Sequence, residues 1–149
     1  MGNIVSVHVS VLDNEHELCA AALARLVKER STEAMKQVLQ TYQQHFAHEE
    51  ELLDEHLYSD IKNNGGGGGF SADGSARTSH FEDHKRLIRE IVEELQKMDS
   101  NGYATASNGF VNRVLRDFEQ HANRYDDAYA ERLSNALITA DDEEFEMFD

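Results

Sequence analysis

Histidines and carboxylates recur in this sequence at spacings that suit a metal site. His80 and His84 are four residues apart, and His45 and Glu49 repeat that spacing with a carboxylate in the second place. Residues four apart lie on one face of an α-helix, so each pair can direct two ligand atoms at one metal ion. Both pairs are therefore candidate metal ligands, although each spacing taken alone also occurs by chance in charged helices.

Three further candidate ligands, His16, His121 and Asp126, lie outside these two pairs. Asp126 follows His121 by five residues, which on an ideal α-helix turns its side chain about 140° away. A local π-type turn, with its wider hydrogen-bond spacing, would bring the two side chains to the same side. If both residues bind one metal, the spacing predicts such a turn after His121.

The elements that position these residues are predicted to be helices. Apolar residues recur at helical spacing in four stretches, and no stretch of useful length alternates with the period of two that strands require. Asp13 is the expected N-cap of the first helix, and Ser79 with Glu82 forms an expected capping box for the third. The expected helices span about 13–30, 32–57, 79–98 and 108–137. Their apolar stripes comprise Leu12, Cys19, Leu23, Leu26 and Val27; Met35, Val38, Leu39, Tyr42, Phe46, Leu53 and Leu57; Phe81, Leu87, Ile88, Ile91, Leu95 and Met98; and Val111, Val114, Leu115, Phe118, Tyr125, Tyr129 and Leu133.

Two stretches between these helices are predicted to be loops. Residues 59–79 contain five consecutive glycines at 65–69, and their composition predicts a flexible loop. Residues 99–109 form the second expected loop. We expect one domain over 1–137, followed by an acidic tail over 138–149.

The apolar stripes also contain the candidate ligands, as with His16 beside Cys19 and Leu23. Four amphipathic helices bury such stripes most simply in an all-α, antiparallel, up-down-up-down four-helix bundle. Burying titratable groups there costs free energy unless they pair or bind a metal. A shared metal site satisfies all of them, whereas a metal-free acidic helical adaptor leaves their positions unexplained.

The composition argues against several classes of protein. Acidic residues outnumber basic ones by 29 to 14, and the formal charge of −15 repels phosphate backbones and anionic membrane surfaces. No apolar run approaches the roughly 18 residues of a membrane span. With Cys19 as the single cysteine, no intramolecular disulfide can form, which favours a reducing, cytoplasmic location. We expect neither nucleic-acid binding nor stable membrane insertion.

The first residues allow two interpretations. Met1, Gly2 and Ser6 fit the pattern for N-myristoylation after methionine removal, which would add a weak membrane association in a eukaryotic cell. The alternative is an unmodified amino terminus, which the shortness of the pattern favours. Even a modified terminus would bind membranes only marginally, because one acyl chain is a weak anchor.

Four segments carry the candidate ligands: DNEHEL around His16, HFAHEEELLDEHLY from His45, HFEDH from His80 to His84, and HANRYDDAY from His121. At these segments the chain resembles the hemerythrin family, in particular its bacterial-type domains. The resemblance implies a non-haem di-iron centre whose two iron ions share an oxo or hydroxo bridge. The implied ligands are His80, His84 and His121 for one iron, His16 and His45 for the other, and Glu49 and Asp126 as bridging carboxylates.

The function implied by this resemblance is reversible O2 binding, for storage, transport or sensing. An enzyme that reduces peroxide or oxidises a small substrate at the same centre is the alternative. Ferritin-like di-iron oxidases use ExxH motifs, and the absence of that motif here favours the binding protein. Tyr129 either donates a hydrogen bond to Asp126 or packs in the core. We expect His48 to face solvent and His56 to lie outside the ligand set.

Overall fold

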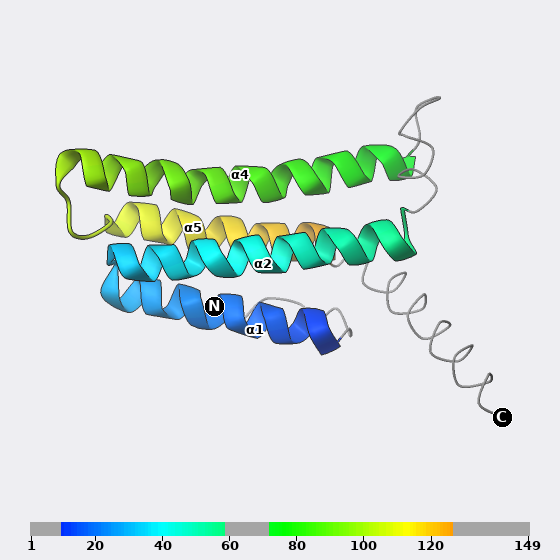
Figure 1. Ribbon diagram of the computed structural model, residues 1–149, viewed down its shortest axis with the longest axis horizontal. Coiled ribbons are helices and arrows are strands. Elements are labelled where there is room, and N and C mark those ends of the chain that lie inside the picture. The colour runs from blue at the N-terminus through cyan, green and yellow to red at the C-terminus, as the bar shows by residue number, and fades with distance from the viewer. Residues whose placement is uncertain (1–9, 59–71, 127–149) are drawn as a thin grey trace.

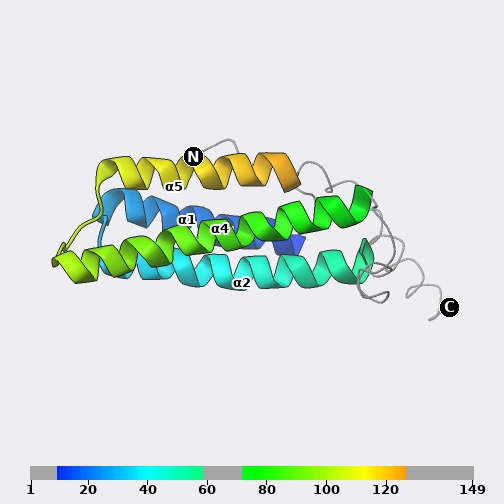
Figure 2. The same cartoon turned by 90° about the horizontal axis from the view of Figure 1, so that it is seen from above.

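The described part of the chain forms four α-helices that lie side by side (Figure 1). The computed structural model describes residues 10–58 and 72–126. Its elements are α1 (Ser10–Glu29), α2 (Thr32–His56), α4 (Ala72–Asn101), α5 (Asn108–His121) and a π-helical turn, η1 (Ala122–Asp126). Successive helices run in opposite directions, as the colour order shows in Figure 1 and again in Figure 2. The predicted all-α, antiparallel four-helix bundle is therefore confirmed.

Serine side chains set the starts of α2 and α5. The Ser31 hydroxyl accepts a hydrogen bond from the backbone N–H of Ala34 at 3.1 Å, and the Ser107 hydroxyl accepts one from Phe110 at 3.1 Å. Each bond satisfies a backbone donor that the first helical turn leaves unpaired. The predicted starts of these two helices, at 32 and 108, are confirmed.

The two short connections of the bundle are tied together at one end. Arg30 adopts a positive φ of 51° and ends α1, and its carbonyl accepts a hydrogen bond from the Ala106 N–H at 2.8 Å. The Arg30 guanidinium donates in turn to the Ala106 carbonyl at 3.2 Å. Gly102 ends α4 with a φ of 69°, a left-handed conformation that glycine adopts without strain. This end of the bundle is thus closed by backbone contacts.

The apolar core occupies the half of the bundle next to these connections. Helix α1 contributes its later turns, α2 its earlier turns, α4 its later turns and α5 its earlier turns, as antiparallel packing requires. Tyr42 stacks on Phe118 with ring centroids 5.3 Å apart and lies 5.2 Å from Phe46. The buried core comprises Cys19, Ala22, Leu23, Leu26, Ala34, Met35, Val38, Tyr42, Phe46, Leu87, Ile91, Met98, Ala106, Phe110, Val111, Val114 and Phe118.

Helix α4 begins earlier than the sequence indicated. It starts at Ala72 rather than Ser79, so 72–79 of the expected loop are helical, and the glycine run lies outside the described residues. The Ser79 hydroxyl does not cap the helix but hydrogen-bonds the Tyr125 hydroxyl at 2.7 Å. Arg77 donates to both carboxylate oxygens of Asp54 in α2, at 2.7 and 2.9 Å. This bidentate pair stabilises turns that local composition alone did not predict.

Three smaller differences concern α1 and α4. Helix α1 begins at Ser10 rather than at the expected cap Asp13, and α4 continues to Asn101 rather than ending at 98. Val27 was expected in the apolar stripe but is 50% exposed. At 100° per residue it lies about 80° around the helix from Cys19, beyond the buried edge. The expected end of the fourth helix, near 137, lies outside the described residues.

None of the described helices is both long and apolar enough to cross a membrane. The segment considered for N-myristoylation and the predicted acidic tail lie outside the described residues, so both stay predictions.

Candidate metal centre

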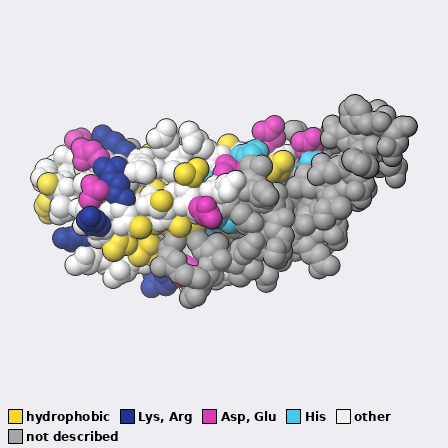
Figure 3. Space-filling model, turned by 90° about the horizontal axis from the view of Figure 1, so that it is seen from below, with side chains coloured by type: hydrophobic (Ala, Val, Ile, Leu, Met, Phe, Trp, Pro, Cys, Tyr) yellow, Lys and Arg dark blue, Asp and Glu magenta, His cyan; other side chains and the backbone are white. Residues whose placement is uncertain are grey.

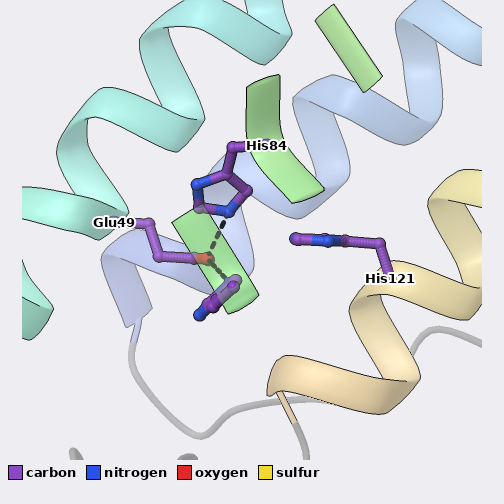
Figure 4. A group of neighbouring side chains, drawn as sticks. Glu49, His84 and His121 are labelled. Carbon is purple, nitrogen blue, oxygen red and sulfur yellow. Dashed lines mark hydrogen bonds and ion pairs between the residues drawn. The ribbon is translucent and has the colours of Figure 1, made fainter. Parts of the chain in front are cut away.

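Histidine and glutamate side chains replace the apolar core in the other half of the bundle. Glu49 comes from α2, His84 from α4 and His121 from α5, and their side chains converge on one point between the helices (Figure 4). Glu49 is fully buried, and the exposed fractions of His84 and His121 are 1% and 4%. The helical spacing that buries leucines further along the bundle therefore buries titratable groups here.

The first group consists of Glu49, His80, His84 and His121, whose ligand atoms all lie within 4.8 Å of one another. The Oε1 atom of Glu49 is 2.8 Å from His80 Nε2 and 3.1 Å from His84 Nε2. The pair His80 and His84, predicted from its spacing to share a helix face, does so on α4. We call these four residues the three-histidine group.

The second group consists of His16, His45 and Glu49, which are also buried and meet the same distance criterion. His45 Nε2 lies 3.3 Å from Glu49 Oε2, and the His16 and His45 rings are 4.8 Å apart between centroids. We call these residues the two-histidine group. Glu49 belongs to both groups and presents a different oxygen atom to each, an arrangement that suits a carboxylate bridging two metal ions.

The charges in the cluster favour cations around Glu49. Burial alone would raise the pKa of Glu49, but hydrogen bonds from His45, His80 and His84 hold it well below the ordinary value. Burial likewise opposes protonation of His84, yet hydrogen bonds to Glu49 and Glu50 raise its pKa. A buried carboxylate of this kind is stabilised by a proton on a neighbouring imidazole or, equally, by a metal ion bound in the proton's place.

His121 shows that the donor set fits a metal. Burial lowers its pKa, and its Nδ1–H donates to Asp83 Oδ2 at 2.7 Å, so Nε2 carries a lone pair. This Nε2 atom is buried and has no hydrogen-bond partner among the described residues. Leaving a buried acceptor unpaired costs about 1–3 kcal/mol. Ligation by a cation would remove that cost, so the buried histidine and glutamate groups fit a metal site.

Aromatic rings cover the cluster. Phe46 stacks on the His84 ring with centroids 4.1 Å apart and contacts His121 at 5.4 Å, while Tyr125 stacks on His80 at 4.6 Å. Such rings hold the imidazoles in fixed orientations and keep water from the interior. On the outer side of His121, a pocket of about 510 Å³ is lined by Asp83, Arg86, Gln120, His121, Asn123 and Arg124.

Two carboxylates that hydrogen-bond these histidines were missed in the sequence. Glu50 Oε2 lies 2.8 Å from His84 Nδ1, and Asp83 holds His121 as described above. A third, Glu15, lies 3.8 Å from His45 Nδ1 and 2.8 Å from His48 Nδ1. The signal available in the sequence was adjacency, because each of these carboxylates is next to a candidate ligand along the chain.

The structure brings together six of the seven predicted ligands: His16, His45, Glu49, His80, His84 and His121. For the seventh, Asp126, the predicted π-type turn is present as η1, which starts directly after His121 and ends at Asp126. The Asp126 side chain, Tyr129 and His8 lie outside what the structure describes. His48, expected to face solvent, is half-exposed and pairs with Glu15, and His56 belongs to neither of the two groups found among the described residues.

Comparison with known families gives one match: residues 7–133 match the family described as Hemerythrin HHE cation binding domain. This range includes all seven predicted ligands. Comparisons with curated proteins and with solved structures gave no match.

Proposed function

Because the chain belongs to the Hemerythrin HHE cation binding family, we propose that its buried histidine and glutamate groups hold a non-haem di-iron centre that binds O2 reversibly. The observation that carries this proposal is the position of Glu49, buried between two histidine groups and directing one oxygen atom at each. Two metal ions that share a carboxylate lie close enough to act on one small ligand together.

The proposed ligands follow from the two groups. His80, His84 and His121 would hold one iron, His16 and His45 the other, and Glu49 would bridge them together with Asp126. The π-helical turn after His121 supports a role for Asp126, because i to i+5 spacing brings residue 126 back toward the side of residue 121. Tyr129 would hydrogen-bond the Asp126 carboxylate from outside the metals.

The number of imidazoles differs between the two positions. The two-histidine group offers one imidazole fewer than the three-histidine group. With a preference for about six ligands per iron, the position held by His16 and His45 keeps room for an external ligand. We therefore place O2 binding on that side of Glu49.

A ferrous pair held by these residues would supply the electrons needed for reversible O2 binding. The chain's own part is to hold the ligands and exclude water. Phe46 excludes water, since its ring centroid lies 5.6 Å from that of His45 and its ring stacks on His84. A dry, aromatic-lined site would slow the release of O2 as a reduced product that leaves the iron oxidised, which favours reversible binding over turnover. A cytoplasmic location for this O2-binding protein also stays a prediction.

The test is repeated oxygenation of the purified, iron-loaded protein. We expect two irons per chain, and absorption spectra that return to the starting state when the oxygenated protein is degassed, over several cycles. His45→Ala should abolish the spectral cycle, while His56→Ala, a matched histidine on the same helix outside both groups, should leave it unchanged. Irreversible oxidation on first exposure, with rapid peroxide reduction, would replace this proposal with the peroxide-reducing or substrate-oxidising enzyme.

A further inference from the structure

The carboxylates beside the ligands follow one geometric rule. Glu15 comes directly before His16 on α1, Glu50 directly after Glu49 on α2, and Asp83 directly before His84 on α4. Each reaches a histidine of the next described helix: Glu15 approaches His45, Glu50 holds His84 and Asp83 holds His121.

The carboxylate precedes the ligand on α1 and α4 but follows it on α2, and helix geometry explains this alternation. Adjacent residues on an α-helix are 100° apart around its axis. Neighbouring helices are antiparallel. Moving one residue toward the N-terminus on α1 or α4 therefore rotates the side chain in the same sense, viewed along the bundle axis, as moving one residue toward the C-terminus on α2. Each carboxylate is therefore turned from the interior toward the following helix. At the equivalent position beside α5, directly after His121, the residue is Ala122, which has no carboxylate to contact a neighbouring histidine.

The two short pairs belong to the same histidine group. Glu50 and Asp83 lie 2.8 and 2.7 Å from the Nδ1 atoms of His84 and His121, both members of the three-histidine group. At the two-histidine group, Glu15 is 3.8 Å from His45 Nδ1 and is shared with His48 at 2.8 Å. The short Nδ1 contacts of Glu50 and Asp83 therefore both belong to the three-histidine group.

A carboxylate that accepts the Nδ1–H bond has two effects on a histidine. It fixes the tautomer in which Nε2 is the free donor atom, and it makes that atom more basic toward a metal. Asp83 is well placed for this, because its other oxygen atom accepts a hydrogen bond from Arg86 Nε at 2.8 Å, which holds the carboxylate toward His121.

We propose that Glu50 and Asp83 are positioning residues that tighten metal binding by the three-histidine group. This inference rests on the proposed two-metal centre but not on its reaction with O2. It predicts that removing either carboxylate weakens metal binding at the position of His80, His84 and His121.

The test uses Zn²⁺, which needs neither oxygen nor a reductant. Metal-free protein is titrated with Zn²⁺ against a competing chelator, in a His45→Ala background that leaves the three-histidine group intact. Glu50→Gln and Asp83→Asn keep side-chain size but remove the charge, and each should weaken Zn²⁺ binding about 10-fold or more. The matched controls, Glu51→Gln and Glu82→Gln, change exposed neighbours in the sequence and should leave affinity unchanged.

A second measurement separates positioning from a general loss of structure. In zinc-loaded protein, the Nδ1 protons of His84 and His121 should give downfield NMR signals, and each signal should move upfield only in the variant that removes its own partner. If Asp83→Asn unfolds the bundle because Arg86 also loses a partner, Glu50→Gln carries the test, since Glu50 makes no contact with Arg86.

Wild-type affinity in both charge-removing variants would overturn the proposal. A protein that fails to cycle O2 yet shows these zinc affinities would contradict the proposed function alone.

Discussion

The two halves of this bundle are built from the same four helices but bury different chemistry. Next to the short connections, the inward positions hold leucine, methionine, valine and phenylalanine, and in the other half imidazoles around Glu49 are buried beside Leu53 and Phe81. On the face drawn in Figure 3, lysine and arginine side chains gather toward one end, while histidine and acidic side chains lie side by side further along. The same helical periodicity thus specifies which residues face inward in both halves. The residue types then decide whether that interior forms an apolar core or a group that can bind a metal.

The halves meet at Phe46, which belongs to the apolar core and stacks on His84 with centroids 4.1 Å apart. The difference between the halves predicts a difference in their response to mutation. Changes in the apolar half should lower stability whether or not metal is present. Changes in the histidine half should act mainly through the metal, because ligation is coupled to folding.

The largest expected effect is that of Glu49→Ala. This change removes the carboxylate that, among the described residues, belongs to both histidine groups, so neither position should retain stoichiometric iron. The increase in the unfolding temperature that iron gives the unmodified protein should disappear with it. Metal analysis and thermal unfolding with and without iron measure both effects, and Glu51→Ala, an exposed neighbour, is the control. Two irons per chain in Glu49→Ala would contradict the shared role of this residue.

An intermediate effect is expected from Leu26→Ala in the apolar half. Leu26 is fully buried, and truncating such a leucine costs about 2–5 kcal/mol through lost burial and the cavity left behind. The loss should be equal in iron-loaded and metal-free protein, which denaturant unfolding of both forms can measure. Leu18→Ala on the same helix, at a position 62% exposed, should cost little. A loss seen only in the iron-loaded form would show that the halves are not separable.

The smallest effect concerns Glu90, which lies outside both groups. Burial and the nearby Asp117 carboxylate raise the pKa of Glu90, so ionising it weakens the folded state. The protonated form of Glu90 therefore contributes fully to stability below the unfolded-state pKa near 4.5. This contribution is lost as the pH rises through the higher folded-state pKa. Glu90→Gln should be slightly more stable than the unmodified protein at pH 7, by under about 1 kcal/mol, and the gain should vanish near pH 4. Glu93→Gln, at an exposed position, is the control. If it gives the same gain in stability, the lower net negative charge, and not the environment of Glu90, would explain the effect.

Much of the candidate site could be predicted from local pattern. The i to i+4 pairs, His45 with Glu49 and His80 with His84, lie on inward helix faces as expected, because a helix face is a property of one segment. The π-type turn after His121 was also predictable, since a spacing of five fits one side only if the helix is locally wider. The start of α4 could not be predicted in this way, because the pair of Arg77 with Asp54 that stabilises its first turns joins residues on two helices.

The sequence by itself therefore determined that four amphipathic helices form and that histidines and Glu49 are buried among their apolar residues, because both depend on periodicity within a segment. Only the tertiary structure decided that Glu49 lies between two histidine groups and that Glu50 and Asp83 hold histidines of the following helices. Those contacts depend on the rotation and axial shift of one helix against another. Packing of whole helix faces sets these two quantities, and no spacing within a single segment records them.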